Sequence, residues 1–336
     1  MLKKFFKKEK QFLVLIGLFF VAILAFRNQP RIAMWIGFAL AGYSAIANDS
    51  VQSLGSFLAS NQKVKWWILW LFLGGILVSV FSYGYFMGDV SFGRLDKIPE
   101  VQEFHIIQLF APLILLFLTR FKMPVSTTFL LLAVFSDSKT ITGMLEKTVM
   151  GYFVAFFSAA LIWTAIATLM KKKIFFKKNY NRSLWKVLQW GATAYLWSSW
   201  LMQDTANVVV FLPRDLLPLQ FGVIAASLFV GLGVLIYLRG GKIQEIITEK
   251  TDVLDPRSAT IIDFVFGTIL FYFKGISNLP MSTTWVFLGL LAGRESALTL
   301  FSGKEIPYAK TLRLVMKDLF LAGVGLGISV LIASMV

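Results

Sequence analysis

Two aspartates lie where apolar segments give way to polar residues. Asp49 belongs to the stretch Ala-Asn-Asp-Ser, and Asp204 belongs to the stretch Gln-Asp-Thr-Ala-Asn. Four amide side chains accompany the two carboxylates: Asn48, Gln52, Gln203 and Asn207. Helix capping would explain a single aspartate, but it explains neither the amides nor the repetition. Because carboxylate and amide oxygens are ligands of hard cations, these residues predict binding of a proton or of a cation such as sodium.

A second motif, Pro-x-Ser-Thr-Thr, also occurs twice. Its copies begin at Pro124 and Pro280 and supply six hydroxyl side chains: Ser126, Thr127, Thr128, Ser282, Thr283 and Thr284. Proline suits the first turn of a helix, so the residues after it offer backbone N–H groups at the positive end of a helix dipole. Such ends bind oxyanions. An ordinary helix cap would explain one copy, whereas two copies favour a pair of anion-binding elements.

The two kinds of motif recur at one spacing. Asp204 follows Asp49 by 155 positions, and Ser282 follows Ser126 by 156 positions. Such recurrence predicts two related halves. We expect four parts: an N-terminal basic segment with an extra helix (1–31), a first repeat (32–170), a basic connector (171–183) and a second repeat (184–336).

The elements that must position these motifs are membrane helices. The chain of 336 residues is 57% hydrophobic and 15% charged, whereas a soluble domain is about 45–50% apolar and about 25% charged. Apolar segments occur near 12–26, 32–47, 66–86, 104–120, 148–170, 184–202, 219–238, 257–276 and 313–334. We therefore expect an all-α polytopic membrane protein with about 10–12 membrane segments.

Four apolar pieces beside the motifs are shorter. They lie near 50–60, 125–136, 205–212 and 281–293. A helix needs about 20 residues to cross a bilayer, so these pieces predict broken or re-entrant helices. Such elements are tolerated only where protein or water covers their backbone.

The basic residues indicate topology rather than nucleic-acid binding. The net charge is +15, and the lysines and arginines cluster before the first apolar segment and in the connector 171–183. This bias holds loops at the cytoplasmic face and attracts anionic membrane lipid. The chain has no cysteine, so disulfides and thiolate metal sites are excluded. The segment 12–26 resembles a signal peptide without a cleavage pattern, and we expect a retained first helix in a multi-pass protein of the cell membrane.

A carboxylate in an anion site would repel the bound anion, and two chemical solutions avoid this repulsion. A carboxylate can accept a hydrogen bond from a protonated oxyanion such as phosphate, or it can hold a cation that neutralises the site. An anion that enters against a negative-inside potential needs such a companion, at about 2.3 kcal/mol per charge per 100 mV. Coupled transport follows from either solution.

At these motifs the sequence resembles the inorganic phosphate transporter (PiT) family, as a short member without a large central insert. That family carries motifs close to G-A-N-D-V-A-N-A and P-x-S-T-T-H in each half. The matching residues are Ala47, Asn48, Asp49, Asp204, Ala206 and Asn207 for the first motif, and Pro124, Ser126, Thr127, Thr128, Pro280, Ser282, Thr283 and Thr284 for the second. The chain departs from the family at Gln52, Gln203, Phe129 and Trp285, the last two of which replace the motif histidines.

The resemblance implies two inverted-topology repeats with a substrate site near the midplane between them. It implies phosphate contacts from Asp49, Ser126, Thr127, Thr128, Asp204, Ser282, Thr283 and Thr284. It places the coupling ion, sodium or a proton, at Asn48, Asp49, Gln52, Gln203, Asp204 and Asn207. The implied function is symport of inorganic phosphate by alternating access.

Two alternatives remain beside this interpretation. Sulfate or a related oxyanion would use the same fold, because it is also tetrahedral. An enzyme would use Asp49 and Asp204 as an intramembrane pair that shares a proton. We reject the enzyme, because the local patterns do not resemble aspartyl protease motifs and both Ser-Thr-Thr elements would have no role. Lipid-facing helices also allow a homo-oligomer.

Overall fold

The computed structural model describes residues 10–120, 125–171, 181–238, 256–301 and 308–336, and the regular secondary structure within these ranges is entirely helical. The first half contains α2 (Lys10–Phe26), α3 (Pro30–Ser60), α4 (Trp66–Phe86), α5 (Ile106–Arg120), α6 (Thr127–Leu132), the 3₁₀ turn η1 (Ala133–Phe135) and α7 (Ser138–Lys171). The second half contains α8 (Arg182–Asp204), α9 (Ala206–Val209), α10 (Pro218–Tyr237), α12 (Pro256–Ile276), α13 (Thr283–Phe301) and α14 (Tyr308–Ala333).

Five of the described helices are long and apolar enough to cross a bilayer. They are α4, α7, α10, α12 and α14, and two shorter apolar helices lie in α2 and α5. The helices α3 and α8 are longer than 20 residues but carry buried polar side chains, among them Ser44 and Ser53 in α3 and Gln189 and Thr193 in α8. These two helices pack against each other. They therefore form the polar interior of the bundle, which the more apolar helices surround.

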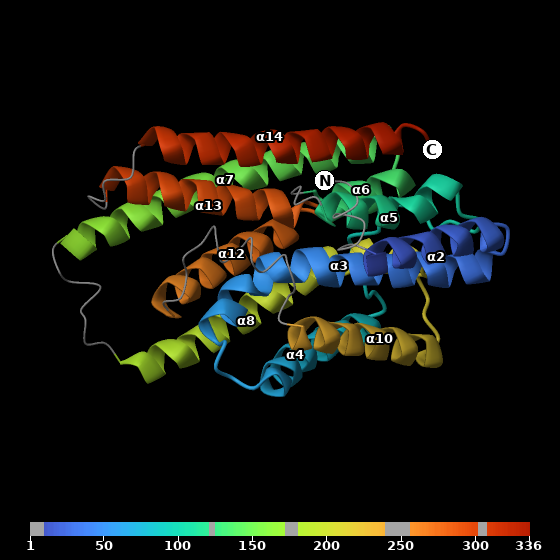
Figure 1. Ribbon diagram of the computed structural model, residues 1–336, viewed down its shortest axis with the longest axis horizontal. Helices are drawn as coiled ribbons and strands as arrows, with labels where there is room; N and C mark the ends of the chain where they lie inside the picture. The colour runs from blue at the N-terminus through green and yellow to red at the C-terminus, as the bar shows by residue number, and fades with distance from the viewer. Residues whose placement is uncertain (1–9, 121–124, 172–180, 239–255, 302–307) are drawn as a thin grey trace.

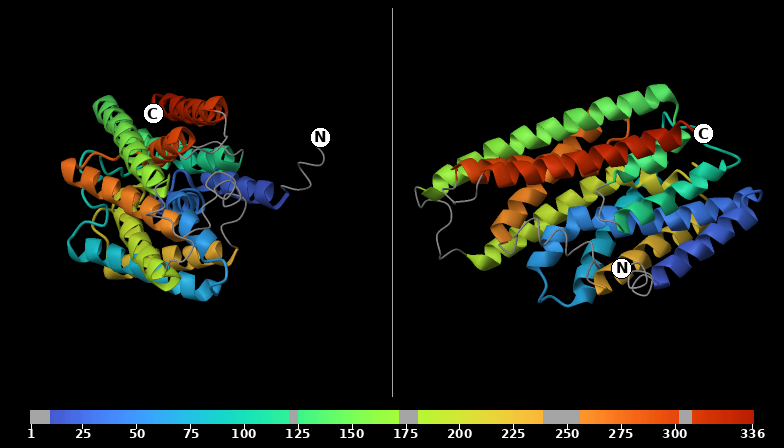
Figure 2. Two further views of the ribbon diagram at one scale, coloured as in Figure 1. Left: turned by 90° about the vertical axis from the view of Figure 1, so that its left-hand side faces the viewer. Right: turned by 45° about the horizontal axis from the view of Figure 1, so that its top comes forward.

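Figure 1 shows how the helices are layered. The helices α7, α13 and α14 run together along one side, α4 and α10 form the opposite side, and α3, α8 and α12 lie between them. Figure 2 shows the same grouping from two other directions. The extra helix α2 packs against α3 and α5 near one end of the bundle.

Contacts between helices follow a matched pattern in the two halves. The series α3, α4, α5, α6, α7 corresponds in order to α8, α10, α12, α13, α14. The pair α3 and α5 packs together, as does α8 and α12, and α7 packs against α13 just as α14 packs against α6. Equivalent helices also meet, namely α3 with α8 and α4 with α10. This pattern supports two related halves, and the inverted relation between them stays a prediction.

Two of the four expected short elements are present, and two are not. The turn η1 ends the short helix α6, and a break at Thr205 separates α8 from the short helix α9. The expectation was wrong for residues 50–60, because α3 continues unbroken to Ser60 in a stretch that contains no proline. It was also wrong for residues 281–293, because α13 continues for 19 residues to Phe301.

The length of α13 depends on close packing against α7. Gly289 and Gly293 lie one helical turn apart on α13, and a Cβ atom at either position would collide with a backbone carbonyl of α7, at Tyr152 or Phe156. Small residues at this spacing allow two membrane helices to approach closely. These two glycines therefore hold the second Ser-Thr-Thr element against the first half.

Candidate functional site

The centre of the candidate site is the carboxylate of Asp204, which ends α8 and is 1% exposed. The Thr128 hydroxyl donates a hydrogen bond to its Oδ1 at 3.2 Å, and Asn207 Nδ2 donates to the same oxygen at 2.9 Å. Thr128 lies in the first turn of α6, in the other half of the sequence. The break after α8 therefore brings one acidic motif into contact with the opposite Ser-Thr-Thr motif.

The second Ser-Thr-Thr motif reaches the same place. The Thr128 hydroxyl lies 3.4 Å from the carbonyl oxygen of Met281, and the Thr283 hydroxyl interacts with the Asp204 carboxyl. All six predicted hydroxyl residues, Ser126, Thr127, Thr128, Ser282, Thr283 and Thr284, are buried. The structure thus joins three of the four predicted motifs.

The two motif serines cap helices in the same way. Ser126 Oγ accepts a hydrogen bond from Phe129 N at 3.2 Å, and Ser282 Oγ accepts one from Trp285 N at 3.4 Å. Each serine thereby satisfies one N–H group of a first helical turn. The expectation that the backbone N–H groups after the prolines stay free is wrong at Phe129, at Trp285 and at Ser282, whose N–H donates to Thr148 Oγ1 at 3.1 Å. These three amides are therefore not free to bind a ligand.

Several buried oxygens of the second acidic motif lack a donor of normal geometry among the described residues. They are Oδ2 of Asp204, Oδ1 of Asn207 and Oε1 of Gln203. An unsatisfied buried acceptor costs about 1–3 kcal/mol. Carboxylate and amide oxygens of this kind fit a sodium ion or a proton donor. Gln203 is also anchored to α12, because its Nε2 donates to the Leu270 carbonyl at 2.8 Å.

The first acidic motif is placed only by its backbone. Residues 47–52 continue α3, which packs against α6, α8 and α9. The side chains of Asn48, Asp49 and Gln52 lie outside the described residues, as does Pro124. Their predicted contacts with substrate or coupling ion stay predictions.

Sequence reasoning missed a buried cation, Arg94. Its side chain is 0% exposed, and its Nη1 donates to the carbonyl oxygens of Ser277 at 2.6 Å and Leu279 at 3.2 Å. Burial lowers the pKa of Arg94 to about 10, while the charge of Asp204 opposes this shift. The guanidinium therefore stays positive at neutral pH. No sequence signal singled it out, because an arginine in a polar connector is normally solvated.

A compact turn positions Arg94. Asp89 Oδ1 accepts hydrogen bonds from Ser91 N at 2.7 Å and from Ser91 Oγ at 2.6 Å, and its Oδ2 accepts one from Gly93 N. Gly93 has a φ of +80° and packs directly against the side chain of Asn278. This turn rests against the segment just before the second Ser-Thr-Thr motif.

Two further buried charged groups escaped the sequence reasoning. Lys147 of α7 donates from Nζ to the same two carbonyls as Arg94, at 2.9 Å to Ser277 and 2.7 Å to Leu279. Asp263 of α12 is fully buried and accepts hydrogen bonds from Ser56 Oγ at 2.6 Å and Thr193 Oγ1 at 2.5 Å. Thr193 precedes Asp204 by 11 residues in α8, which is about 16 Å along a helix. Asp263 therefore lies apart from the Asp204 cluster.

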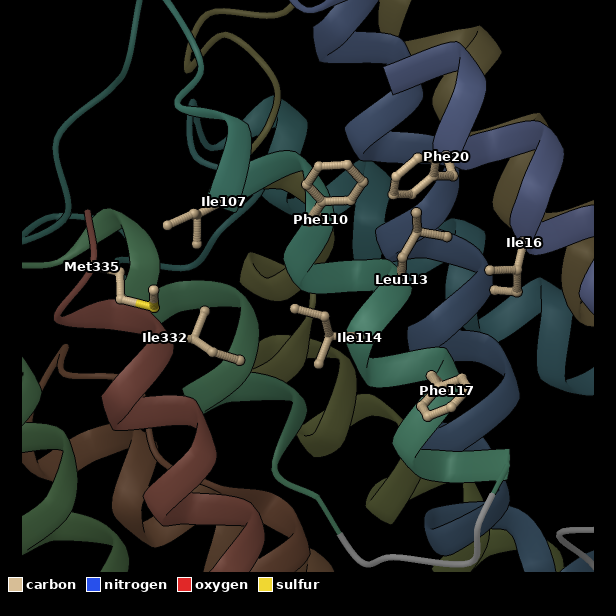
Figure 3. Close-up of a pocket in the computed structure, with 9 residues that line it drawn as sticks. All are labelled: Ile16, Phe20, Ile107, Phe110, Leu113, Ile114, Phe117, Ile332 and Met335. Carbon is tan, nitrogen blue, oxygen red and sulfur yellow. The ribbon is translucent and has the colours of Figure 1, made fainter. Parts of the chain in front are cut away.

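A pocket of about 420 Å³ at one end of the bundle is not part of this site. Figure 3 shows its lining from α2, α5 and α14, where the Phe20 and Phe110 rings face each other with centroids 5.1 Å apart. The other lining residues are Ile16, Ile107, Leu113, Ile114, Phe117, Ile332 and Met335. Every one of them is apolar, so the pocket offers nothing that holds an ion.

The fold has a counterpart among solved structures. It matches one described as "The sodium-dependent phosphate transporter" with a TM-score of 0.57 and 16% sequence identity, over 91% of this chain and 98% of that chain. Neither a protein-family model nor a curated protein matches the chain. At this identity the likeness establishes the fold. Together with the five helices able to cross a bilayer, it identifies the chain as an integral membrane protein with the fold of that transporter.

Proposed function

We propose that the protein is a secondary active transporter that moves inorganic phosphate across the cell membrane together with sodium ions or protons. The shared fold supports transport as the general activity. The observation that carries the substrate assignment is the buried Asp204 carboxylate, which hydroxyl groups of both Ser-Thr-Thr motifs approach. Such a site offers a hydrogen-bond acceptor and several donors in one place.

Phosphate satisfies both kinds of group. Its unprotonated oxygens can accept hydrogen bonds from the O–H groups of Ser126 and Ser282, whose Oγ atoms act as acceptors in the helix caps, and its P–OH group donates to the Asp204 carboxylate. A fully ionised oxyanion would instead meet the carboxylate as a like charge. The site therefore favours an oxyanion that still carries a proton at neutral pH.

We assign the coupling ion to the same cluster, which contains Asp204 and Asn207. The unsatisfied oxygens of Asp204 and Asn207 are suitable ligands for sodium, and the Asp204 carboxylate can alternatively accept a proton. In either case, the added positive charge reduces the cost of bringing an anion to a buried carboxylate. Because the cluster joins residues from both halves of the sequence, movement of one half relative to the other would expose it to each side in turn.

Sulfate transport by the same fold is the second candidate. The favouring observation is the set of hydroxyl donors, which serves any tetrahedral oxyanion equally well. The two candidates differ at Asp204, because sulfate has no proton to donate near neutral pH.

The groups hydrogen-bonded to Asp204 are a hydroxyl and an amide, which suits binding, so we assign the site no catalytic reaction.

A competition assay in proteoliposomes tests the proposal. Uptake of labelled phosphate is measured with and without sodium, at one acidic and one neutral pH, while unlabelled phosphate or sulfate competes. We expect phosphate to compete and sulfate to compete poorly. Sulfate uptake that phosphate does not reduce would support the second candidate and contradict the first.

A further inference from the structure

One side of the buried Arg94 guanidinium has no hydrogen-bond partner among the described residues. Its Nη1 is engaged by the carbonyls of Ser277 and Leu279, whereas Nε and Nη2 are buried and have no hydrogen-bond partner among the described residues. Nε and Nη2 form one side of the planar guanidinium, and this side matches two oxygens of a carboxylate or phosphate group. Leaving a buried cationic donor without a partner is costly. The side chain is thus anchored at one nitrogen and available at the other two.

Arg94 lies in the neighbourhood of Asp204. Leu279, which anchors Nη1, precedes Met281 by two residues, and the Met281 carbonyl lies 3.4 Å from the Thr128 hydroxyl that contacts Asp204. Arg94 and Asp204 attract each other electrostatically. Within the described part of the chain, however, they form no direct ion pair.

We propose that Arg94 is a ligand of the transported oxyanion, binding two of its oxygens through Nε and Nη2 while Asp204 accepts a hydrogen bond from its hydroxyl group. This assignment rests on the proposed function and makes it more specific. The ligand completes the hydrogen bonds of both buried charges at once. It also gives a reason for the preference for phosphate, because sulfate satisfies Arg94 but has no proton to donate to Oδ2 of Asp204 near neutral pH.

Hydrogen bonds on both sides of Arg94 hold the surrounding backbone in place, which supports a binding role for its side chain. Asp89 accepts three hydrogen bonds inside the turn that precedes Arg94, and Asn278 Nδ2 donates to Asp96 Oδ2 at 2.7 Å on its other side. A donor fixed in this way loses little side-chain entropy when it binds a ligand. Arg94 is also hydrogen-bonded to the segment that leads into Ser282 and Thr283.

If Arg94 had a purely structural role, it would only hold the 277–279 segment in place through its hydrogen bonds to Ser277 and Leu279. Lys147 provides the matched control, because its Nζ contacts the same two carbonyls from α7. Loss of either residue removes hydrogen bonds to those carbonyls. Only loss of Arg94 removes the Nε and Nη2 donors.

The test measures phosphate binding by the purified full-length protein as the half-saturating phosphate concentration fitted to the rise of its melting temperature with phosphate concentration. Sulfate is titrated in parallel, and the variants are Arg94→Lys, Arg94→Gln and Lys147→Gln. We expect Arg94→Lys to raise the half-saturating phosphate concentration about tenfold or more, because the paired donors are lost while a positive charge remains. Arg94→Gln should abolish phosphate-dependent stabilisation. Lys147→Gln should lower the ligand-free melting temperature but change half-saturation by no more than about twofold.

Three contrary results can be told apart. Wild-type protein that binds phosphate with an affinity that neither Arg94 variant changes would overturn the assignment of Arg94 and leave the proposed function intact. Wild-type protein that is stabilised by neither phosphate nor sulfate would contradict both. If only sulfate stabilises the wild type, phosphate transport is contradicted, and the Arg94 variants then decide the role of the guanidinium from the sulfate titration. Should Arg94→Gln fail to fold, the Arg94→Lys titration alone decides.

Discussion

The Thr128 hydroxyl donates a 3.2 Å hydrogen bond to the Asp204 carboxylate, although the two residues are 76 positions apart and belong to different halves of the sequence. The bond links the first Ser-Thr-Thr motif to the second acidic motif at a buried position. A movement of the two halves that opens the site must therefore break or rearrange it. This relationship makes Thr128 and Asp204 the first residues to test.

Replacing Asp204 with Asn should abolish coupled uptake and leave the protein folded. The amide keeps the size of the side chain but removes the charge that holds a proton or a sodium ion. The measurement is gradient-driven phosphate uptake in proteoliposomes, with elution on size exclusion as the check on folding. Asp215→Asn is the control, because Asp215 belongs to the same stretch of sequence and is exposed. Normal uptake by Asp204→Asn would remove this carboxylate from the mechanism.

Asp49→Asn should have the same effect as Asp204→Asn. The prediction rests on the equivalent place of Asp49 in the first acidic motif. If only the second carboxylate were needed, Asp49→Asn would transport normally, and the two halves would then differ in function.

Thr128→Val should weaken phosphate binding, whereas Thr128→Ser should retain most of it. Valine has nearly the shape of threonine but cannot donate to Asp204, and a hydrogen bond to a charged group contributes about 1.5–3 kcal/mol. We expect the KM for phosphate to rise about tenfold in the valine variant. If Thr128→Val and Thr128→Ser had equal KM values for phosphate, the Thr128 hydroxyl would have no part in phosphate binding.

Gly293→Ala should destabilise the protein by about 1–3 kcal/mol, because its Cβ would meet the Phe156 carbonyl at the interface of α7 and α13. Gly323→Ala is the matched control, since nothing lies near a Cβ at that position of α14. The control should be neutral or slightly stabilising. Thermal unfolding in detergent compares the two, and equal melting temperatures would contradict the close packing.

Asp137→Ala should weaken the start of α7 in a pH-dependent way. Asp137 Oδ1 accepts a hydrogen bond from Thr140 N at 2.8 Å, and the hydrogen bonds from Thr140 lower the pKa of the Asp137 carboxyl below its model-peptide value of 3.8. A lowered pKa means that the ionised form stabilises the fold above that value and that this contribution is lost as the pH falls through the folded-state pKa. The difference in stability between wild type and Asp137→Ala should therefore shrink below about pH 4. Asp137→Ser keeps a capping oxygen that does not titrate, so its stability relative to Asp137→Ala should not change over this range.

Much of the fold follows from the sequence, because long apolar segments have few alternatives to membrane helices. The ends of the helices were harder to predict. A Pro-x-Ser-Thr-Thr motif marks where a helix begins, but the length of that helix depends on what packs against it. The first copy leads into the six residues of α6, and the second leads into α13, which continues along α7 through Gly289 and Gly293.

Repetition of the motifs pointed to several residues of the candidate site before the structure was known. The repetition identified Asp204, Asn207 and Thr128, which the structure brings together. Arg94 could not be found in this way, because it occurs once and its anchoring carbonyls lie 183 and 185 positions away. Only the folded chain places such a residue beside the motifs.

Accumulation of labelled phosphate by proteoliposomes under an imposed sodium or proton gradient tests the central claim most directly. Wild-type protein should concentrate phosphate when one of these gradients is present, and Asp204→Asn should not. Dissipating the gradient should stop accumulation by the wild type. Phosphate movement that is the same with and without either gradient, or no phosphate movement by folded wild-type protein, would contradict the account.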